Sequence, residues 1–400
     1  MTTTPDYLIA GGGVVGVTTA LTLKQRYPDA SVILMEKESA CGQHASGRNS
    51  GVLHAGFYYT ADSLKARFTR IGNQRMTAYC KEKGLAINEC GKLVVAKNQE
   101  ELETLETLKQ RGEANGIDIQ EITVAEAREM EPRVRTHERA LFSPTTSSVN
   151  PAQIMASLEK EAVALGVEVR TGVHCQGRVH GGRVRTDDGD MTPGYFINAS
   201  GLQADQIART FGFSEKYRIL PFKGLYLYED APQPVRMHIY PVPDLRNPFL
   251  GVHYTVTVDH KTKLGPTAIP CFWREQYGGM DGFDFNEFLG MAWRQANLVL
   301  FSNFAFKRLA IEESRKYSRR VMASMAGVIA TDSRPENCRV WAKPGIRAQL
   351  VETARNALVN DFVIEGDHKS LHVLNAVSPA FTCSFPFAEH IVDEIERLRA

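Results

Sequence analysis

The run Tyr-Leu-Ile-Ala-Gly-Gly-Gly-Val-Val-Gly occupies residues 7–16 and decides the fold. Its first four residues are apolar and predict a short strand that is buried on both faces. Apolar residues then recur at helical spacing over 17–27, and the run over 31–36 predicts a second buried strand. A strand, a helix and a strand with G-x-G-x-x-G in the first turn form the βαβ unit that binds dinucleotides.

Each residue of this turn has a separate task in that unit. Gly11 permits the tight turn, Gly13 lets the backbone approach a pyrophosphate, and Gly16 lets the helix pack closely against the strand. Val15 lies in the first helical turn, whose positive dipole end faces the phosphates. Glu36 follows twenty residues after Gly16, where an acid binds ribose hydroxyls. A glycine-rich surface loop is the alternative, but the flanking elements and the terminal acid all favour the dinucleotide site.

The segment after Glu36 is long for a loop inside a compact domain, and such loops are usually functional. It extends to Tyr59 and is dense in glycine and small polar residues. A solvated loop is the alternative, but Val52, Leu53 and Phe57 make the segment too apolar for that. We therefore expect its backbone N–H groups to line a flavin. The expected contact residues are Lys37, Ser46, Asn49, Ser50, Gly51 and Val52.

Residues 49–59, Asn-Ser-Gly-Val-Leu-His-Ala-Gly-Phe-Tyr-Tyr, resemble the signature of the L-2-hydroxyglutarate dehydrogenases (oxidases). These are FAD enzymes of the D-amino-acid-oxidase-like group. Further matching segments follow in order along the whole chain, at 239–245, 248–255, 264–266, 343–349 and 375–380. The resemblance implies FAD as the cofactor and a 2-hydroxy (di)carboxylate as the substrate.

The fold class that we predict is α/β. A Rossmann-like FAD-binding domain of the glutathione-reductase or D-amino-acid-oxidase type is joined to an α+β substrate domain with a mixed or antiparallel sheet. The FAD-binding domain is discontinuous and takes residues 1–80, 150–215 and 340–400, and the substrate or cap domain takes 81–149 and 216–339. Helices are expected over 64–84, 100–115, 151–165, 281–320 and 382–398, and strands over 90–96, 167–173, 195–201 and 371–375.

Later segments return the chain to the flavin. Residues 195–201 predict a buried strand that ends in a small-residue turn, a device by which flavoproteins of this architecture approach the cofactor. The last helix is expected to direct its positive end toward the negative charge of reduced flavin. The residues expected at the cofactor from these segments are Val173, Ser200, Gly201, Gly345, Ser378, Pro379 and Ala380.

Oxidation of a secondary alcohol through a flavin requires a base for the hydroxyl proton and cations for the carboxylates. His54 lies in the segment 37–59, which we call the flavin loop, and is our candidate for the base, although a histidine merely bonded within a packed loop is the usual alternative. Arg347 is the candidate for bidentate capture of a carboxylate. Lys223 is expected to line the site or hold the loop. His253 and Tyr254 alternate along a strand, and we favour His253 as the one that faces inward.

The sequence departs from the family pattern in one strand. Thr267 stands where the family has Asn, and residues 270–273 read Pro-Cys-Phe-Trp in place of aliphatic and Lys residues. If this strand lines the pocket, selectivity for the side chain of the substrate differs, so another 2-hydroxy acid stays open.

Composition excludes several classes of protein. Forty-seven Lys and Arg balance forty-six Asp and Glu, so no global basic field for nucleic acid exists. The seven cysteines occur singly, which argues against disulfides and metal sites and fits a reducing compartment. No apolar stretch is long enough to span a bilayer, and the N-terminal run lacks the basic start of a signal peptide. We expect a cytoplasmic protein.

A basic segment adds a possible partner. Six basic residues lie between 307 and 320 beside Leu298–Leu300 and the phenylalanines at 301, 304 and 306. The segment is a candidate for peripheral contact with anionic lipid on the inner face of the cell membrane, with a membrane quinone as electron acceptor. An ordinary helix with a solvated basic face is the alternative, and oxygen is the alternative acceptor.

Three other functions stay open at this level. An amine-oxidising relative, such as a glycine or D-amino-acid oxidase, shares the fold but needs no dedicated base. A flavin or NAD sensor without enzymatic activity binds the cofactor and leaves it oxidised. An NAD-dependent hydroxy-acid dehydrogenase is disfavoured, because neither a second dinucleotide fingerprint nor a matching substrate signature is found.

Overall fold

The computed structural model describes residues 4–244, 249–302 and 306–400. Of the residues singled out above, Leu245, Pro248 and Phe304 lie outside these ranges. Within the described ranges, no helix is both long enough and apolar enough to cross a membrane.

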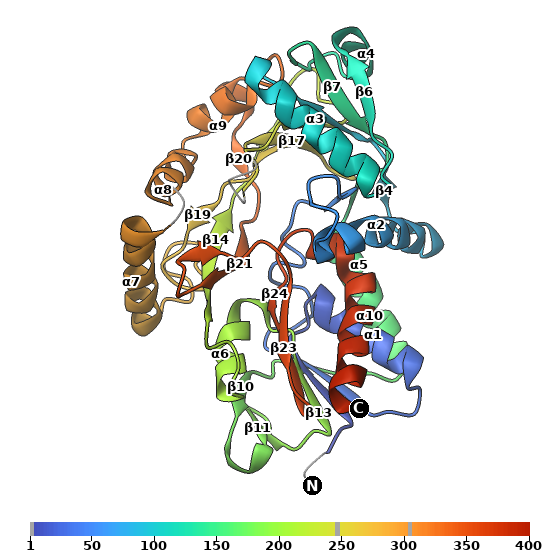
Figure 1. Ribbon diagram of the computed structural model, residues 1–400, viewed down its shortest axis with the longest axis vertical. Coiled ribbons are helices and arrows are strands. Elements are labelled where there is room, and N and C mark those ends of the chain that lie inside the picture. Colours follow the sequence, from blue (N-terminus) through green and yellow to red (C-terminus); the bar gives the residue numbers. More distant parts are fainter. Residues whose placement is uncertain (1–3, 245–248, 303–305) are drawn as a thin grey trace.

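A six-stranded sheet forms the lower half of the molecule in the view of Figure 1. Its core is parallel, with β1 between β2 and β13, while β23 pairs antiparallel with β24 at one edge. The strands in spatial order are β23 (Val363–Gly366), β24 (Ser370–Asn375), β13 (Tyr195–Asn198), β1 (Tyr7–Ala10), β2 (Val32–Glu36) and β9 (Glu168–Thr171).

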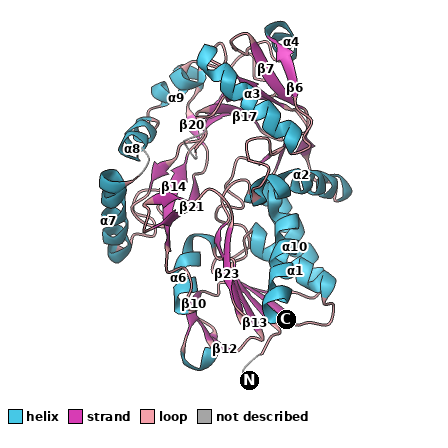
Figure 2. Ribbon diagram, in the orientation of Figure 1, coloured by secondary structure: helices cyan, strands magenta, loops and turns pink. Residues whose placement is uncertain are grey.

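The four residues of β1 are all buried because each face of the sheet is covered. Tyr7 and Ile9 belong to a core shared with the helices, whereas Leu8 and Ala10 pack toward a small antiparallel sheet on the other face. The helices of the first face are α1 (Val14–Arg26), α2 (Leu64–Glu82), α5 (Pro151–Ala164) and α10 (Ala380–Arg399), seen together in Figure 2. The second face carries β10 (Cys175–Arg178), β11 (Val184–Thr186), β12 (Gly189–Met191) and α6 (Ala204–Thr210).

The upper half is built on an eight-stranded sheet. Its strands in spatial order are β20 (Val340–Trp341), β15 (Leu227–Glu229), β18 (Thr262–Gly265), β17 (His253–Val256), β16 (His238–Pro241), β5 (Lys92–Val95), β7 (Arg139–Ser143) and β6 (Gln120–Thr123). Pairing is antiparallel except between β5 and β16, so the sheet is mixed. Helices α3 (Gln99–Ala114), α4 (Val124–Met130) and α9 (Arg319–Ala326) lie around it (Figure 1).

Two smaller sheets join the halves. The first has the order β19 (Ile269–Pro270), β14 (Tyr217–Gly224), β21 (Gly345–Glu352) and β22 (Ala357–Leu358). Helices α7 (Phe285–Phe301) and α8 (Phe306–Arg315) cover it on the outer side. The second sheet places β8 (Ser147–Val149) between β3 (Val52–Leu53) and β4 (Ile87–Asn88).

The predicted Rossmann-like sheet and the mixed sheet above it are confirmed. The expected helices are also found, and the region 281–320 contains three helices rather than one. Capping explains the start of α5, because Asn150 accepts hydrogen bonds from the amides of Ala152 and Gln153 and Pro151 follows it. The small sheet over 175–191 and the strand β21 were not predicted. The domain boundaries given above remain a proposal.

Candidate active site

A cavity of about 840 Å³ lies where the six-stranded sheet meets the upper half. Sixteen of the eighteen expected cofactor residues line it. They are Gly11, Gly13, Val15, Glu36, Lys37, Ser46, Asn49, Ser50, Val52, Val173, Ser200, Gly201, Gly345, Ser378, Pro379 and Ala380.

Gly16 and Gly51 do not line the cavity. A Cβ on Gly16 would strike the carbonyl oxygen of Gly11, so this glycine lets α1 pack against the turn, as the sequence indicated. Gly51 has a φ of +81° and its α-carbon faces the Val149 carbonyl, which makes it a packing residue of the flavin loop.

The first turn of α1 fits a pyrophosphate. Gly13 stands before the helix and makes no side-chain cap, and the first amides of a helix have no partner within it. The Ser46 hydroxyl accepts a hydrogen bond from the Val14 amide at 2.8 Å, and its own proton is free to donate. A Cβ on Gly13 would lie 3.2 Å from that oxygen, so the bare glycine keeps the approach open. We call residues 11–16 together with Ser46 the phosphate turn.

Glu36 is held in place at the end of β2. Its carboxylate accepts hydrogen bonds from the amides of Gly12 at 2.8 Å and Glu38 at 2.9 Å. The residue is buried at the cavity wall, where its remaining lone pairs fit the hydroxyls of a ribose.

Lys37 makes ion pairs with Glu38 at 2.7 Å and Glu275 at 2.9 Å. Ligand atoms of Glu38, His44 and Glu275 lie within 4.8 Å of one another, a spacing suited to a metal ion. The Lys37 ammonium already pairs with both of these carboxylates.

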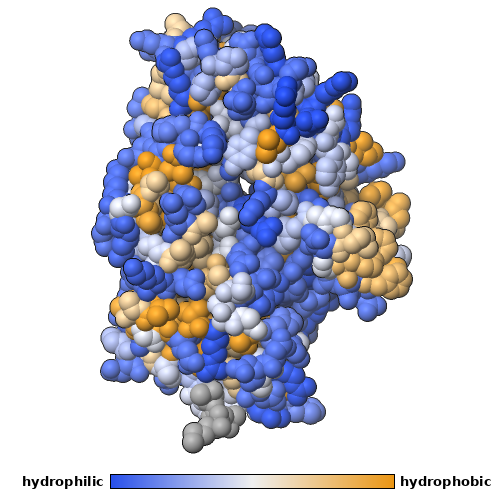
Figure 3. Space-filling model, turned by 180° about the vertical axis from the view of Figure 1, so that it is seen from behind, coloured by the Kyte–Doolittle hydropathy of each residue, from blue (hydrophilic) through white to orange (hydrophobic). Residues whose placement is uncertain are grey.

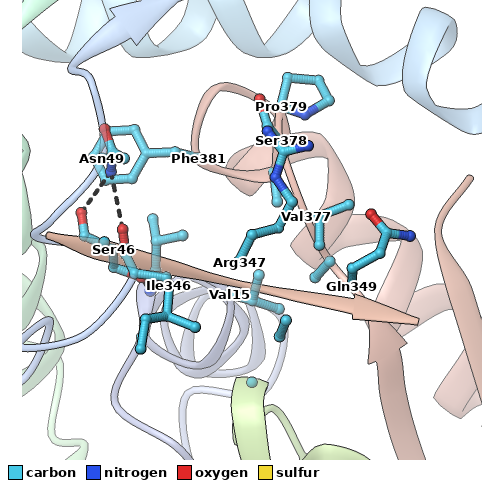
Figure 4. A pocket seen from close by; sticks show the side chains of 18 of the residues that line it. Val15, Ser46, Asn49, Ile346, Arg347, Gln349, Val377, Ser378, Pro379 and Phe381 are labelled. Atoms are coloured by element: carbon cyan, nitrogen blue, oxygen red, sulfur yellow. Dashed lines mark hydrogen bonds between the residues drawn. The ribbon is translucent and has the colours of Figure 1, made fainter. Parts of the chain in front are cut away.

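The opposite wall of the cavity comes from the last quarter of the chain. Figure 4 shows Arg347 and Gln349 on β21, and Ser378 and Pro379 just before α10. Gly345 allows β21 to approach the flavin loop, because a Cβ there would lie 2.5 Å from the Arg48 carbonyl oxygen. Asn49 of that loop is fixed by hydrogen bonds to the carbonyls of Ala45 and Ser46 (Figure 4).

A group of polar residues around His54 is called the roof cluster here: His54, Lys92, His238, Tyr240 and His253. His54 is half-buried and the other four are buried, and His54, Tyr240 and His253 line the cavity. Lys92 and His238 are paired on adjacent strands, and His253 stacks on Tyr240 with ring centroids 3.7 Å apart. Main-chain contacts fix the tautomers of two histidines when they are neutral. Nδ1 of His253 donates to the Gly251 carbonyl, whereas Nδ1 of His238 accepts from the Val256 amide.

Lys92 is the least expected member of the roof cluster. Its side chain is fully buried, and its Nζ has no hydrogen-bond partner among the described residues. Instead the ammonium lies over the rings of Phe57, Tyr58 and Tyr240, at 4.4, 4.7 and 4.9 Å from their centroids. Burial lowers the pKa of Lys92 to about 7.

His54 is neutral near neutral pH. Burial, followed by the positive charge of Lys92, holds the pKa of His54 well below its usual 6.5. Its main chain is anchored, because its amide donates to the hydroxyl of Thr382 at 3.2 Å. A neutral imidazole at the cavity wall is able to take up a proton.

Two cations at the cavity wall have no carboxylate partner. Among the described residues, neither Arg347 nor Lys65 makes an ion pair, and no hydrogen bond is formed by either side chain. Lys65 is buried on α2, and burial and the nearby Arg347 lower its pKa to about 8. Asp361, an acid that acts electrostatically on Lys65, accepts hydrogen bonds from the amides of Leu64 and Lys65. The two cations are therefore available to an anionic ligand.

Some of the remaining residues considered in the sequence line the cavity, and others do not. His253 lines the cavity, whereas Tyr254 packs in a separate core. Tyr58 and Tyr59 also line the cavity. Lys223 does not line it. Residues alternate along β14, so Phe222 reaches the cavity and the Lys223 side chain lies near Cys271 and Asp281.

The altered strand contributes little to the cavity. Thr267 lines it, and the Thr267 hydroxyl donates to the Lys223 carbonyl and accepts from the Leu225 amide. Cys271 and Trp273 are buried elsewhere, and the Trp273 indole donates to the carbonyl of Asp281. The change at 270–273 therefore does not alter the cavity wall directly.

Lys65 and Lys92 were missed in the sequence. The sequence pattern could have identified Lys92, because it begins the run Lys-Leu-Val-Val, and a single charged residue in a buried strand indicates a special role. Lys65 follows a helix cap at Ser63 and looks like an ordinary surface lysine until the fold brings β21 and residue 361 against it.

Comparison with known proteins extends over the whole chain. The family described as "FAD dependent oxidoreductase" matches residues 6–394. L-2-hydroxyglutarate dehydrogenase of Escherichia coli K12 is 35% identical over 407 residues, which cover 99% of this chain and 94% of that protein. The human mitochondrial L-2-hydroxyglutarate dehydrogenase is 33% identical over 422 residues, which cover 98% of this chain and 89% of that protein.

Solved structures resemble the fold. L-α-glycerophosphate oxidase of Mycoplasma pneumoniae, solved with FAD bound, has a TM-score of 0.77 at 24% identity. The match covers 99% of this chain and 95% of that chain. Glycine oxidase of Geobacillus kaustophilus has a TM-score of 0.73 at 19% identity, and the match covers 100% of this chain and 96% of that chain.

Proposed function

Because this chain belongs to the family of FAD-dependent oxidoreductases, we propose that it oxidises L-2-hydroxyglutarate to 2-oxoglutarate. One observation of the site supports this substrate more than any other. The cavity wall offers two cations, Arg347 and Lys65, that lack a carboxylate of their own, and this substrate carries two carboxylates.

Arg347 is proposed to bind the carboxylate next to the reacting carbon. Its guanidinium lies over the ring of Phe249, 5.1 Å from the centroid, and both residues line the cavity. A planar fork of N–H donors matches a carboxylate in two parallel hydrogen bonds, which fixes the orientation of the substrate.

Lys65 is proposed to bind the distal carboxylate. Its charge is buried and lies near Arg347, so each cation disfavours the other until anions arrive. A diacid places one carboxylate beside each cation and so offsets both positive charges, whereas a monocarboxylate leaves one buried cation without a counter-charge. This gives the site a physical reason to prefer diacids.

His54 is proposed to take the hydroxyl proton from C2. Burial and, after it, the cations around it lower the pKa of His54 and keep it neutral in the free protein, which is the form that accepts a proton. Binding of a doubly negative substrate offsets these cations and raises the affinity of His54 for the proton. The site thus becomes a better base when the substrate is present.

FAD, when bound, supplies flavin N5 as the acceptor of the hydride from C2. The residues proposed to hold it are those of the phosphate turn, Glu36, Ser200 with Gly201, and the start of α10. Phe222, Tyr58 and Tyr240 add ring surface to the cavity and limit water around the reacting carbon. The acceptor that reoxidises the flavin, a quinone or oxygen, remains a proposal.

The test is anaerobic reduction of the purified yellow protein, followed by flavin absorbance. L-2-hydroxyglutarate, D-2-hydroxyglutarate, L-malate, L-lactate, glycine and D-alanine are added separately. Rapid bleaching by the L-hydroxy diacid, with slower or no bleaching by the others, is the expected result. Bleaching by an amino acid alone would reject the proposal in favour of an amine oxidase.

A further inference from the structure

Helix α7 presents an apolar surface to solvent. We call it the α7 face and define it by Phe285, Leu289, Trp293, Leu300 and Phe301, whose exposed fractions are 62, 51, 73, 71 and 65%. The first three recur every four residues, so they share one side of the helix. In Figure 3 an apolar patch protrudes on the right, at the position of α7 in Figure 1 seen from behind.

The charged residues of α7 lie away from this face. Glu287 pairs with the buried Arg274 at 3.1 Å, and Arg294 donates to the carbonyl of Ile219 at 3.2 Å. Every exposed residue of the helix is therefore uncharged. A surface helix of a soluble domain normally directs its charges outward, so α7 is inverted relative to that rule.

The apolar surface extends beyond α7. Met280 and Phe283 precede the helix and are 65 and 41% exposed, and Ile311 of α8 is 53% exposed. Contiguous apolar patches of this kind on a monomer mark interaction sites.

Cations adjoin the apolar surface. From Met280 to Arg320 the described residues include five exposed cations against three exposed acids, Asp281, Asp284 and Glu312, the last of which pairs with Arg308. The cations are Lys307, Arg308, Arg315, Arg319 and Arg320. Lys316, which the sequence placed with them, is buried and paired with Glu313, so its charge does not reach the surface.

We propose that the α7 face and the adjoining cations of α8 and α9 dock this protein on the surface of an anionic bilayer. Apolar side chains that include a tryptophan, flanked by cations, match the two layers of such a surface: acyl chains below and anionic headgroups above. A second protein chain satisfies the apolar residues equally well but gives no reason for the excess of positive charge.

The docked surface lies close to the active site. Met291 and Leu298 on the inner side of α7 pack in one core with Phe222 and Phe249, and both phenylalanines line the cavity. One helix layer therefore separates the bilayer from the cavity wall.

The test uses the FAD-loaded protein and co-sedimentation with vesicles of phosphatidylcholine, with or without phosphatidylglycerol. Binding is expected only when phosphatidylglycerol is present, and added salt weakens it. The variant Leu289→Gln/Trp293→Gln/Leu300→Gln is expected to lose more than about tenfold in affinity. The variant Lys307→Gln/Arg315→Gln/Arg319→Gln is expected to lose about fivefold per charge, on anionic vesicles alone.

A matched control makes the same kind of substitution, an exposed apolar residue to Gln, at a place away from the α7 face. Val163 and Leu165 are 54 and 42% exposed near the end of α5, and Val163→Gln/Leu165→Gln is expected to bind vesicles like the unaltered protein. Flavin content and reduction by substrate in solution report whether each variant is folded. Fluorescence of Trp293, identified by its loss in Trp293→Phe, is expected to shift to the blue on anionic vesicles.

Three results would overturn the proposal. The first is no sedimentation with either vesicle, and the second is equal binding to both. The third is a dimer in solution that the α7 triple variant converts to a monomer without any effect of lipid. That last result would identify a second copy of the chain as the occupant of the α7 face.

Discussion

The phosphate turn and the roof cluster differ in almost every physical respect. The phosphate turn is neutral, built mainly of backbone atoms, and assigned by ten consecutive residues. The roof cluster holds a buried ammonium and three buried or half-buried histidines from the flavin loop, β5, β16 and β17. The proposed pyrophosphate site thus depends on local geometry, whereas the proposed chemistry depends on long-range packing.

The difference teaches how each region tolerates change. A backbone site fails when an atom is added, because no side chain can move aside. A charged cluster fails when a charge is removed or shifted, while its shape stays the same. Each of the following predictions tests one side of this contrast.

The largest effect is expected from Gly16→Ala. The added methyl group meets the Gly11 carbonyl oxygen, and an overpacked site costs at least about 1–3 kcal/mol. We expect the purified variant to lose its flavin, measured as the ratio of flavin to protein absorbance. Gly290→Ala is the matched control, because a Cβ at that position meets no atom within 4 Å. Full flavin content in Gly16→Ala would show that the turn is not close-packed.

His54→Ala is expected to retain FAD but to be reduced by L-2-hydroxyglutarate about a hundred- to ten-thousandfold more slowly. The reason is the loss of the proposed proton acceptor. Stopped-flow absorbance under anaerobic conditions measures the rate. His44→Ala serves as control, since His44 lines the cavity but is engaged with Glu38 and Tyr277. An unchanged rate in His54→Ala would remove this residue from the mechanism and favour an amine substrate.

Lys65→Met is expected to raise KM for L-2-hydroxyglutarate about tenfold to a hundredfold, because a charged hydrogen bond is worth about 1.5–3 kcal/mol. The kcat value is expected to change less. L-2-hydroxypentanoate, which has no distal carboxylate, is the matched control and should show no increase. Equal increases for both substrates would place Lys65 outside the distal subsite.

The pH dependence gives a second measurement of the same residue. With a pKa of about 8, Lys65 is charged below that pH and neutral above it, so kcat/KM should fall as the pH rises through about 8. Lys65→Arg remains charged and should remove this alkaline decline. Its persistence in Lys65→Arg would assign the decline to another group.

The smallest effect is expected from Lys92→Met. Loss of this neighbouring cation raises the pKa of His54, so the acid limb of kcat/KM should move to higher pH. Lys92→Arg keeps the charge and should leave the limb where it is. If the pH profile of kcat/KM does not move in Lys92→Met, then Lys92 has only a packing role over the rings of Tyr58 and Tyr240.

The contrast also explains what could be predicted from the sequence. The phosphate turn and the flavin loop are local, so their glycines and Glu36 were found, and the expectation of FAD is confirmed by the family. His54 and Arg347 were singled out from segments that resemble a known family. Lys65 could not be found, because its neighbours Arg347 and Asp361 are nearly three hundred residues away. Of the two alternatives for Lys223, the structure does not place it at the cavity wall, because its neighbour Phe222 takes that face of β14.

The order in which the cavity walls occur along the chain has a consequence for biosynthesis. β24 and the start of α10, with Arg347 before them, are translated after every other wall, yet β24 lies inside the sheet against β13. A nascent chain that contains only the phosphate turn and the roof cluster lacks the wall formed by β21, β24 and the start of α10. Charges that are buried in the folded protein are then exposed to solvent. If these residues hold the cofactor as proposed, we expect it to be bound fully only after residues 345–380 have left the ribosome.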